Sequence, residues 1–399
     1  MPAIVRALRH RNYRLYFGGQ LVSLVGTWMQ QIAMSWLAYR LTDSVLVLGL
    51  VGFAGQIPVL VFAPFGGIWS DRVNRRRILI ATQSAAMVQA IVLAALTLSQ
   101  AVQPWHLVAL ALVLGTINAI DIPARQAFVV HLVDDRADLS NAIALNSFAM
   151  NAARLLGPTV AGVVLSVVGE GICFLLNAVS YLTVLLALVA IRSGPQAVSS
   201  RPMASALRQG FRYAFGHDAI RSLLLLVAVV SFTATPYTVL MPVYAKQIFG
   251  GDARTLGLLL GCAGGGALAG TVYLAARKSL DGLERVIALA PVLAGAGLLA
   301  FAFSRSLWVA APALLAVGFG VISTVASANT LIQSLVPDEL RGRVMSLFTM
   351  AFLGMAPLGS LAAGSVAHGV GAPVTLFAGG LCSIAAGLAF AWRRRSGAG

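Results

Sequence analysis

FGGIWSDRVNRRRIL, from Phe65 to Leu79, places one acidic residue and four arginines in the middle of an apolar region. Residues 45–64 before it contain no Lys, Arg, Asp or Glu, and residues 80–108 after it contain none either. Each flanking stretch is long enough to cross a bilayer as a helix, which takes about 20 apolar residues. This segment therefore predicts a charged turn between two membrane-spanning helices.

The composition of the whole chain extends this pattern. Of the 399 residues, 59% are hydrophobic and 10% are charged, whereas soluble domains carry about 25% charged residues. Uncharged stretches of spanning length recur from end to end, and the regular polar positions that a soluble helical bundle needs are missing. These features predict an all-α polytopic membrane protein.

Twelve transmembrane helices are expected, in two pseudo-symmetric bundles of six. A long polar stretch follows the sixth span and divides the chain into an N-terminal bundle at 1–192, a cytoplasmic linker with an amphipathic helix at 193–217, and a C-terminal bundle at 218–399. The spans are predicted at residues 15–39, 45–70, 78–100, 104–130, 140–167, 170–192, 219–245, 254–277, 284–303, 306–333, 342–367 and 372–392.

The basic residues gather on one side of the predicted membrane. Of the 28 Lys and Arg residues, 23 fall in the N-terminus, the even-numbered loops and the C-terminus, counting Arg125 at the end of the fourth span. The opposite loops hold only Arg40, Lys246, Arg254 and Arg305. Because cytoplasmic loops carry the excess of positive charge, both termini are predicted to be cytoplasmic. The net charge of +15 thus reflects topology rather than nucleic acid binding.

The two halves show a weak internal repeat. Residues 47–81 can be laid over residues 255–289 at a constant offset of 208, which pairs Leu48 with Leu256 and Arg77 with Arg285. Such a repeat suggests two related bundles.

The charged turn resembles a known loop signature. Gly67, Asp71, Arg72, Arg75 and Arg76 match the pattern Gly-x-x-x-Asp-Arg-x-Gly-Arg-Arg, which the major facilitator superfamily carries between its second and third helices. The resemblance implies the fold of that superfamily over the full chain. It also implies that this stretch latches the two halves in the outward-facing state.

Two further features bear on the latch. Asn74 replaces the last glycine of the signature, and Asn also tolerates a left-handed backbone. Asp71 is expected at the inner end of its helix, where it can meet the positive N-terminus of the eleventh helix and Arg341 or Arg343. A topology anchor alone would explain the arginines but not the preceding acid.

The fifth span resembles a motif of proton-coupled exporters. Gly157, Pro158 and Gly162 match Gly-x-x-x-Gly-Pro-x-x-Gly-Gly, with Ala153 and Ala161 in place of two glycines. Small residues allow close packing and the proline supplies a kink. A generic packing motif is the alternative interpretation.

Longer segments are similar to the exporter branch that holds enterobactin exporters and macrolide efflux pumps. They include LRHRNYRLYFGGQ at 8–20, NAIDIPARQAF at 118–128 and PDELRGRVMSLF at 337–348. The resemblance implies a secondary active transporter that exports an amphipathic drug, macrolide or siderophore-like molecule by proton antiport. Lysophospholipid transporters are more distant relatives, so a lipid flippase on the same fold is the alternative. Many relatives carry an acid in the first helix where this chain has Thr27.

Ionisable residues within spans are candidates for proton coupling, since charge is costly there. Asp121 and Arg154 lie in adjacent predicted helices at similar depth, and Arg125 shares a helix face with Asp121. These three residues form the predicted coupling site. The alternative is a permanent ion pair that never changes its charge state.

Amide and hydroxyl side chains recur at helical spacing in several spans. In the superfamily, helices 1, 4, 7 and 10 line the central cavity, so the resemblance implies that such residues contact the substrate. The alternative is that they bond only between helices. The expected cavity residues are Gln20, Thr27, Gln30, Gln31, Asn118, Asn151, Tyr237, Thr330 and Gln333.

No catalytic or nucleotide-binding motif is found. The five histidines are scattered, the three cysteines lie alone, and there is no HExxH or GxxxxGK[ST]. We therefore expect neither enzyme activity nor a cofactor or metal, and a sensor or scaffold is disfavoured because no soluble domain is seen. The expected partners are a small-molecule substrate, the proton motive force and membrane lipids, with a monomer in the bacterial cytoplasmic (inner) membrane.

Overall fold

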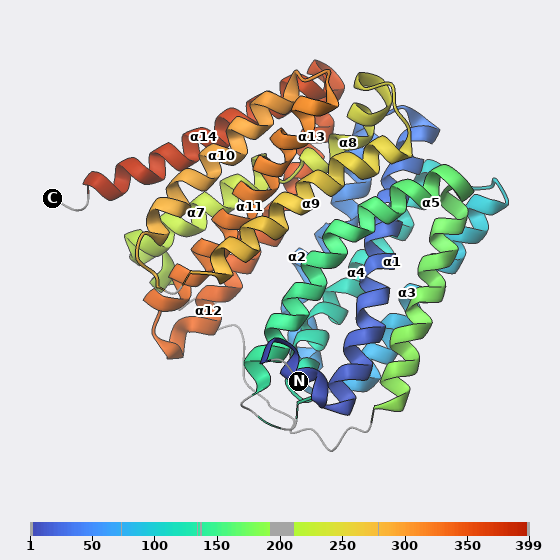
Figure 1. Cartoon of the computed structure of the whole chain (residues 1–399), viewed down its shortest axis with the longest axis horizontal. Helices are drawn as coiled ribbons and strands as arrows, with labels where there is room; N and C mark the ends of the chain where they lie inside the picture. The colour runs from blue at the N-terminus through green and yellow to red at the C-terminus, as the bar shows by residue number, and fades with distance from the viewer. Residues whose placement is uncertain are drawn as a thin grey trace. The chain divides into compact units, whose positions relative to one another are not determined.

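The computed structural model describes residues 3–72, 74–133, 135, 138–191, 211–277 and 279–396, and its regular structure there is entirely helical (Figure 1). For residues 63–72 only the backbone is described. Most of the expected linker at 193–217 lies outside the described residues. Its last part, 211–216, is helical, and the rings of Phe211 and Phe215 stack 4.3 Å apart.

The first half of the chain forms a short 3₁₀ helix and five longer helices. Their bounds are η1 at Ala3–Arg9, α1 at Arg11–Thr42, α2 at Val45–Arg72, α3 at Arg75–Leu98, α4 at Pro104–Val129 and α5 at Leu139–Ala190.

The second half alternates long helices with short irregular turns. Its elements are α7 at Asp218–Thr233, α8 at Tyr237–Val243, η3 at Tyr244–Ile248, α9 at Ala253–Ala275, α10 at Leu283–Ala302, α11 at Leu307–Leu335, α12 at Asp338–Thr349, η4 at Met350–Gly354, α13 at Met355–Val370 and α14 at Ala372–Ser396. Both η3 and η4 are π-helical turns, where one extra residue widens the helix.

Ten helical stretches among the described residues are long and apolar enough to cross a membrane. One of them, Asn141–Ala190, is long enough for two crossings and breaks at Gly169, whose φ of 78° lies in the left-handed region. The 32-residue α1, which is interrupted by polar side chains, is not among these ten but is long enough for a further crossing. The prediction of an all-α polytopic protein is confirmed, and twelve crossings fit the helices described.

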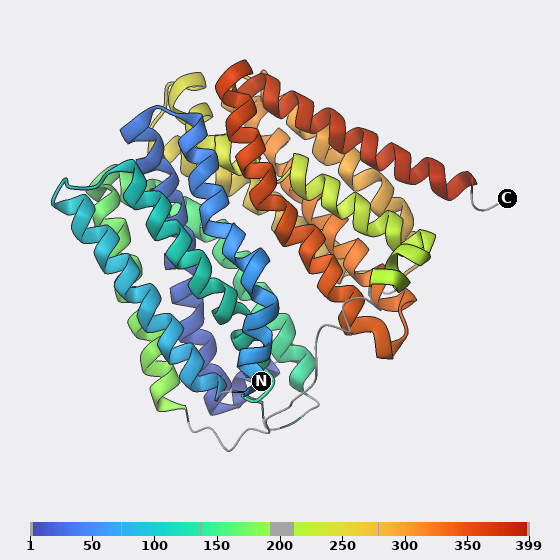
Figure 2. The same ribbon diagram turned by 180° about the vertical axis from the view of Figure 1, so that it is seen from behind.

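The helices group into two compact units. Unit 1 contains residues 1–43 and 54–200, and unit 2 contains residues 44–53 and 201–399. The start of α2 is thus grouped with unit 2, where Gly49 lies against Ser360 and Gly364 of α13. Within each unit the long helices run side by side (Figures 1 and 2).

The same close helix contact occurs in both units. A Cβ on Gly115 of α4 would stand 2.6 Å from the carbonyl oxygen of Gly55 in α2, and one on Gly318 of α11 would overlap the carbonyl oxygen of Ala263 in α9. Gly55 and Ala263 are separated by the 208-residue offset of the sequence repeat. The repeat inferred from weak sequence similarity therefore has a counterpart in the packing.

The turn before α3 differs from the expected geometry. Asn74 has φ −58° and ψ 114°, and its side chain accepts a hydrogen bond from the backbone N–H of Arg77 at 3.3 Å. Asn74 therefore caps α3 instead of adopting the left-handed backbone, because an Asn side chain can satisfy a free N–H at a helix start. The left-handed position occurs 208 residues later, at Gly282, with φ 71°.

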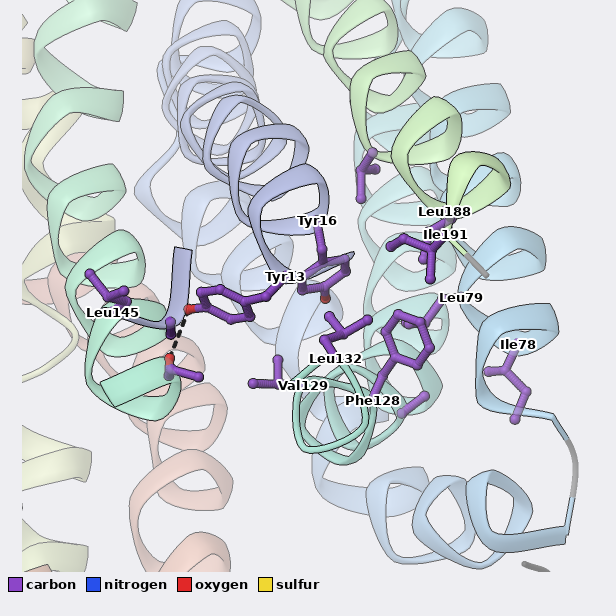
Figure 3. Packing of buried hydrophobic residues seen from close by; sticks show 14 residues of the cluster. Tyr13, Tyr16, Ile78, Leu79, Phe128, Val129, Leu132, Leu145, Leu188 and Ile191 are labelled. Atoms are coloured by element: carbon purple, nitrogen blue, oxygen red, sulfur yellow. Dashed lines mark hydrogen bonds between the residues drawn. The ribbon is translucent and has the colours of Figure 1, made fainter. Parts of the chain in front are cut away.

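The core of unit 1 is centred on aromatic residues of α1 and α4 (Figure 3). Tyr13 and Tyr16 are buried, and the ring of Tyr16 meets that of Phe128 edge to face, with centroids 5.7 Å apart. The Tyr13 hydroxyl donates to the carbonyl oxygen of Ala142 at 2.8 Å. These contacts join α1 and α4 to the start of α5 and position the charged residues nearby.

Candidate functional site

Asp121 lies inside unit 1, with 2% of its surface exposed. Its Oδ1 accepts two hydrogen bonds from α3, one from the hydroxyl of Thr82 at 2.8 Å and one from the amide of Gln83 at 2.8 Å. The guanidinium Nε of Arg125 stands 3.6 Å from the other oxygen, Oδ2. An ionised carboxylate only accepts hydrogen bonds, so each of these contacts suits the charged form.

Arg154 contacts an aromatic residue of α1. Its guanidinium lies over the ring of Trp28 in α1, 5.3 Å from the ring centroid, in a cation–π contact. The ion pair observed for Asp121 among the described residues is with Arg125. The structure thus brings together two of the three predicted coupling residues and places Arg154 against α1.

The exporter motif of α5 explains why Trp28 can come so close. A Cβ on Gly157 would overlap the Cβ of Trp28, so only glycine permits this approach. Pro158 and Gly162 are also buried in the same helix. The motif residues therefore pack α5 against α1 one turn from Arg154.

Part of the polar stripe on α1 bonds to neighbouring helices. Gln30 is fully buried, donates its amide to Oε1 of Gln89 in α3 at 3.0 Å, and accepts from Nδ2 of Asn177 in α5 at 2.8 Å. The Thr27 hydroxyl donates to the Ser23 carbonyl and lies 3.3 Å from the hydroxyl of Tyr181. These contacts are the interhelical bonding that the sequence left open as the alternative.

The other expected cavity residues vary in exposure. Gln20 and Tyr237 are buried, Asn118 and Asn151 are half-buried, and Gln31, Thr330 and Gln333 are exposed within their own units. Asn151 and Thr330 bond back to backbone carbonyls of their own helices, and Gln333 donates to the side chain of Asn329.

The latch residues are only partly described. Arg76 donates to the carbonyl oxygens of Leu188 and Val189 at 2.5 and 2.9 Å, where a cation suits the end of α5. Arg75 bonds to the ring of His131, which follows α4. For Gly67, Asp71 and Arg72 only the backbone is described, so the expected contact of Asp71 with Arg341 or Arg343 stays a prediction. Arg341 and Arg343 lie in α12.

A second charged cluster, which the sequence did not suggest, lies outside the spans. Asp138, just before α5, is paired with Arg6 at 2.6 Å, Arg9 at 2.7 Å and His10 at 2.9 Å. We call these four residues the N-terminal clamp. Burial by itself raises the pKa of Asp138, but the hydrogen bond from His10 and the charges of Arg9 and Arg6 outweigh it and hold the pKa below its ordinary value.

Sequence reasoning missed Thr82, Gln83 and Gln89, three polar residues of the third span. All three are buried and bonded to other helices. The available signal was that a span with no charge carries four polar side chains within two helical turns, these three and Ser84. Among the described residues, no group of three or more His, Cys, Asp or Glu is placed to hold a metal ion.

Comparison with known proteins gives the family context for this geometry. The chain is 28% identical to the staphyloferrin A transporter of Staphylococcus aureus, over 87% of each chain. It is 22% identical to the multidrug efflux pump Tap of Mycolicibacterium fortuitum over 90% of each chain, and 23% identical to macrolide efflux protein A of Streptococcus pyogenes over 61% and 62%.

Solved structures show the same fold at low sequence identity. A bacterial homologue of the human lysosomal transporter Spinster superposes with a TM-score of 0.74 at 14% identity, over 96% of each chain. A bacterial homologue of the iron transporter ferroportin gives 0.72 at 19% identity, over 95% and 98%. The profile of the family described as transmembrane secretion effectors matches residues 4–395. The chain therefore belongs to the transmembrane secretion effector family of the major facilitator superfamily.

Proposed function

We propose that the protein exports an amphipathic small molecule of drug, macrolide or siderophore type by proton antiport through alternating access. It works as a monomer in the bacterial cytoplasmic membrane, with both termini in the cytoplasm and the proton motive force as its energy source. The names of the relatives, a siderophore transporter and two efflux pumps, support a small-molecule substrate rather than a lipid.

The observation that carries the coupling proposal is the carboxylate of Asp121. It is a buried acid within a predicted span, bonded to α3 and paired with Arg125 on its own helix. Burial of an ionisable group at membrane depth is costly and marks functional residues by default. Thr27 occupies the first-helix position where many relatives carry an acid, so α1 does not duplicate this role.

In the proposed cycle, Asp121 binds a proton from the outside and releases it to the cytoplasm while the substrate moves outward. Arg125 stabilises the ionised form, and a change in its distance from Asp121 between conformations alters proton affinity. The charged turn of Gly67, Asp71, Arg72, Arg75 and Arg76, together with Arg341 and Arg343, is proposed to hold the outward-facing state. Arg154, whose guanidinium lies over Trp28, is the second cation proposed to stabilise the ionised form of Asp121.

The test uses inverted membrane vesicles with an imposed proton gradient. Accumulation is measured for a labelled macrolide, an iron-free siderophore, a fluorescent dye and a labelled lysophospholipid. We expect the wild type to concentrate at least one of the first three, and Asp121→Asn to lose accumulation while still letting that substrate equilibrate down its gradient.

Arg305→Gln provides the matched control, because Arg305 is an exposed charge in a loop. It should accumulate substrate like the wild type. Accumulation of the lysophospholipid alone would assign the lipid flippase function instead. Full accumulation by Asp121→Asn would show that Asp121 is a structural ion-pair member.

A further inference from the structure

The α3 neighbours of Asp121 have hydrogen-bonding capacity that the ionised carboxylate does not use. Gln83 donates its amide hydrogen to Asp121, but its carbonyl oxygen Oε1 is buried and has no hydrogen-bond donor within the described part of the chain. Buried polar atoms are normally paired, so an orphaned acceptor beside a carboxylate calls for an explanation.

Thr82 has a related property. Its single hydroxyl hydrogen lies within reach of two acceptors, Oδ1 of Asp121 at 2.8 Å and the backbone carbonyl oxygen of Leu79 at 3.2 Å. When the hydrogen turns to Leu79, an oxygen lone pair of the hydroxyl can face Asp121 instead. Thr82 can therefore donate to Asp121 or accept from it, without moving its helix.

The remaining surroundings of the carboxylate are charged or weakly acidic groups from three helices. Arg125 of α4 faces Oδ2 at 3.6 Å. Tyr16 of α1 and Tyr181 of α5 lie within electrostatic range of Asp121, and the buried Tyr16 hydroxyl has no hydrogen-bond partner among the residues that the structure describes. Of all these groups, the two α3 side chains are the ones bonded directly to Oδ1.

We propose that Thr82 and Gln83 are positioning residues that satisfy Asp121 in both of its charge states. In the ionised state both donate to Oδ1. On protonation, one O–H bond forms on the carboxylate, the Gln83 amide rotates by half a turn so that Oε1 accepts this hydrogen, and Thr82 donates to Leu79. On release the proton returns to water and both groups revert.

We call Thr82 and Gln83, acting in this way, the two-state shell. The proposal rests on the proposed coupling role of Asp121 and deepens it. A shell that could only donate would leave the protonated acid facing hydrogen-bond donors, which resists protonation. A shell that serves both states lets the proton arrive and leave inside the bundle, and it accounts for the orphaned Oε1 of Gln83 as the acceptor kept for the protonated form.

The test is infrared difference spectroscopy on the full-length protein in lipid vesicles, with pH steps as the only probe. The carbonyl band of protonated Asp121 is identified by its loss in Asp121→Asn, and its amplitude is titrated with pH. Thr82→Val and Gln83→Met keep side-chain size but remove the hydrogen bonds. Each should move the titration midpoint away from that of the wild type, because hydrogen bonds to Asp121 are lost. Each should also shift the band frequency.

Two variants serve as controls. Thr82→Ser retains the hydroxyl and should restore the wild-type midpoint. Thr97→Val, also on α3, removes a hydroxyl that bonds only to the carbonyl oxygen of Leu93, and it should leave the band unchanged. Folding of every variant is checked by its thermal unfolding curve.

The possible failures are distinguishable. An Asp121 band that neither Thr82→Val nor Gln83→Met shifts would overturn the two-state shell while leaving the coupling role intact. The absence of any pH-dependent Asp121 band, with accumulation retained in Asp121→Asn, would overturn both proposals together.

Discussion

Two adjacent glutamines of α1 differ in burial and in their hydrogen-bond partners, although they are the same residue type. Gln30 is fully buried and links α3 to α5, whereas Gln31, the next residue, is exposed within its unit. The sequence pattern assigned both to the substrate cavity, because helical spacing alone cannot say whether a polar face meets a cavity or another helix. The bonds of Gln30 to Gln89 and Asn177 support the interhelical alternative for this residue.

This difference predicts distinct effects of the same substitution. Gln30→Leu removes two interhelical hydrogen bonds and leaves buried amide groups of Gln89 and Asn177 without their partner. We expect a loss of about 1–2 kcal/mol per broken contact in the free energy of unfolding, with little change in the order of preferred substrates. Gln31→Leu should leave the free energy of unfolding nearly unchanged but alter the order of preferred substrates. Thermal unfolding and competition transport assays measure the two effects, and equal destabilisation by both variants would contradict the assignment.

The contact between Asp121 and Arg125 could be predicted at this scale. Asp121 and Arg125 were identifiable because an acid within an apolar span stands out and because positions four apart share a helix face. Thr82 and Gln83 were not, since uncharged polar residues are common in spanning helices and their partner lies 38 or 39 residues away. The guanidinium of Arg154 lies over the ring of Trp28, and its predicted pairing with Asp121 stays a prediction, because similar depth on adjacent helices does not fix which way a side chain points.

At the scale of elements, the N-terminal clamp fixes η1 against the start of α5. Arg6, Arg9 and His10 converge on Asp138, and the backbone N–H of Ala7 donates to the side chain of Asn141 at 2.9 Å. Since α5 also carries Arg154 and Gly157, the clamp joins the N-terminal segment to the helix that packs against Trp28.

The pH dependence of the clamp follows from the depressed pKa of Asp138. A group whose pKa is lowered by folding stabilises the folded state above its unfolded value, and that contribution is lost as pH falls through the folded value. The clamp should therefore be complete at neutral pH and open only below the ordinary pKa of 3.8. Hydrogen exchange of the Ala3–Arg9 amides should be slow at neutral pH in the wild type and fast in Asp138→Asn.

The control for the clamp is Asp218→Asn. Asp218 pairs with Arg221 on the surface and its side chain is 87% exposed, so its loss should leave exchange of η1 unchanged. Slow exchange of η1 in Asp138→Asn would mean that apolar packing alone holds the segment.

The paired glycine contacts give a second prediction about elements. Gly115→Ala should push α4 away from α2, and Gly318→Ala should push α11 away from α9. In both cases the added Cβ meets a backbone oxygen that cannot turn aside. Overpacking of this kind costs about 1–3 kcal/mol. Gly18→Ala, where no atom lies within 4 Å of the new Cβ, should be neutral in the same thermal unfolding assay. If either variant is as stable as Gly18→Ala, that close contact is absent.

At the scale of the whole molecule, the fold was more predictable than the site. Uncharged stretches between charged turns define spans, since the bilayer imposes one length and one polarity on all of them. Irregular turns within a span are harder to predict from the sequence. The π-helical turns at Tyr244–Ile248 and Met350–Gly354 follow no pattern visible in the residues, because they depend on which neighbouring helix a carbonyl meets. One such carbonyl, that of Phe352, accepts from Ser231 of α7.

The orientation of the chain in the membrane gives the last prediction. The excess of Lys and Arg in the N-terminus, even-numbered loops and C-terminus assigns those segments to the cytoplasm. Single cysteines can test this once Cys173, Cys262 and Cys382 have been replaced. Ala101→Cys and Arg305→Cys lie at exposed positions in opposite-side loops and should react with an impermeant thiol reagent added to intact cells. Ser279→Cys, in a basic loop, and Gly342→Cys, between Arg341 and Arg343 in α12, are also exposed and should react only after the cells are opened. Labelling of Ser279→Cys in intact cells would invert the topology and, with it, the direction in which Asp121 must take up and release its proton for export.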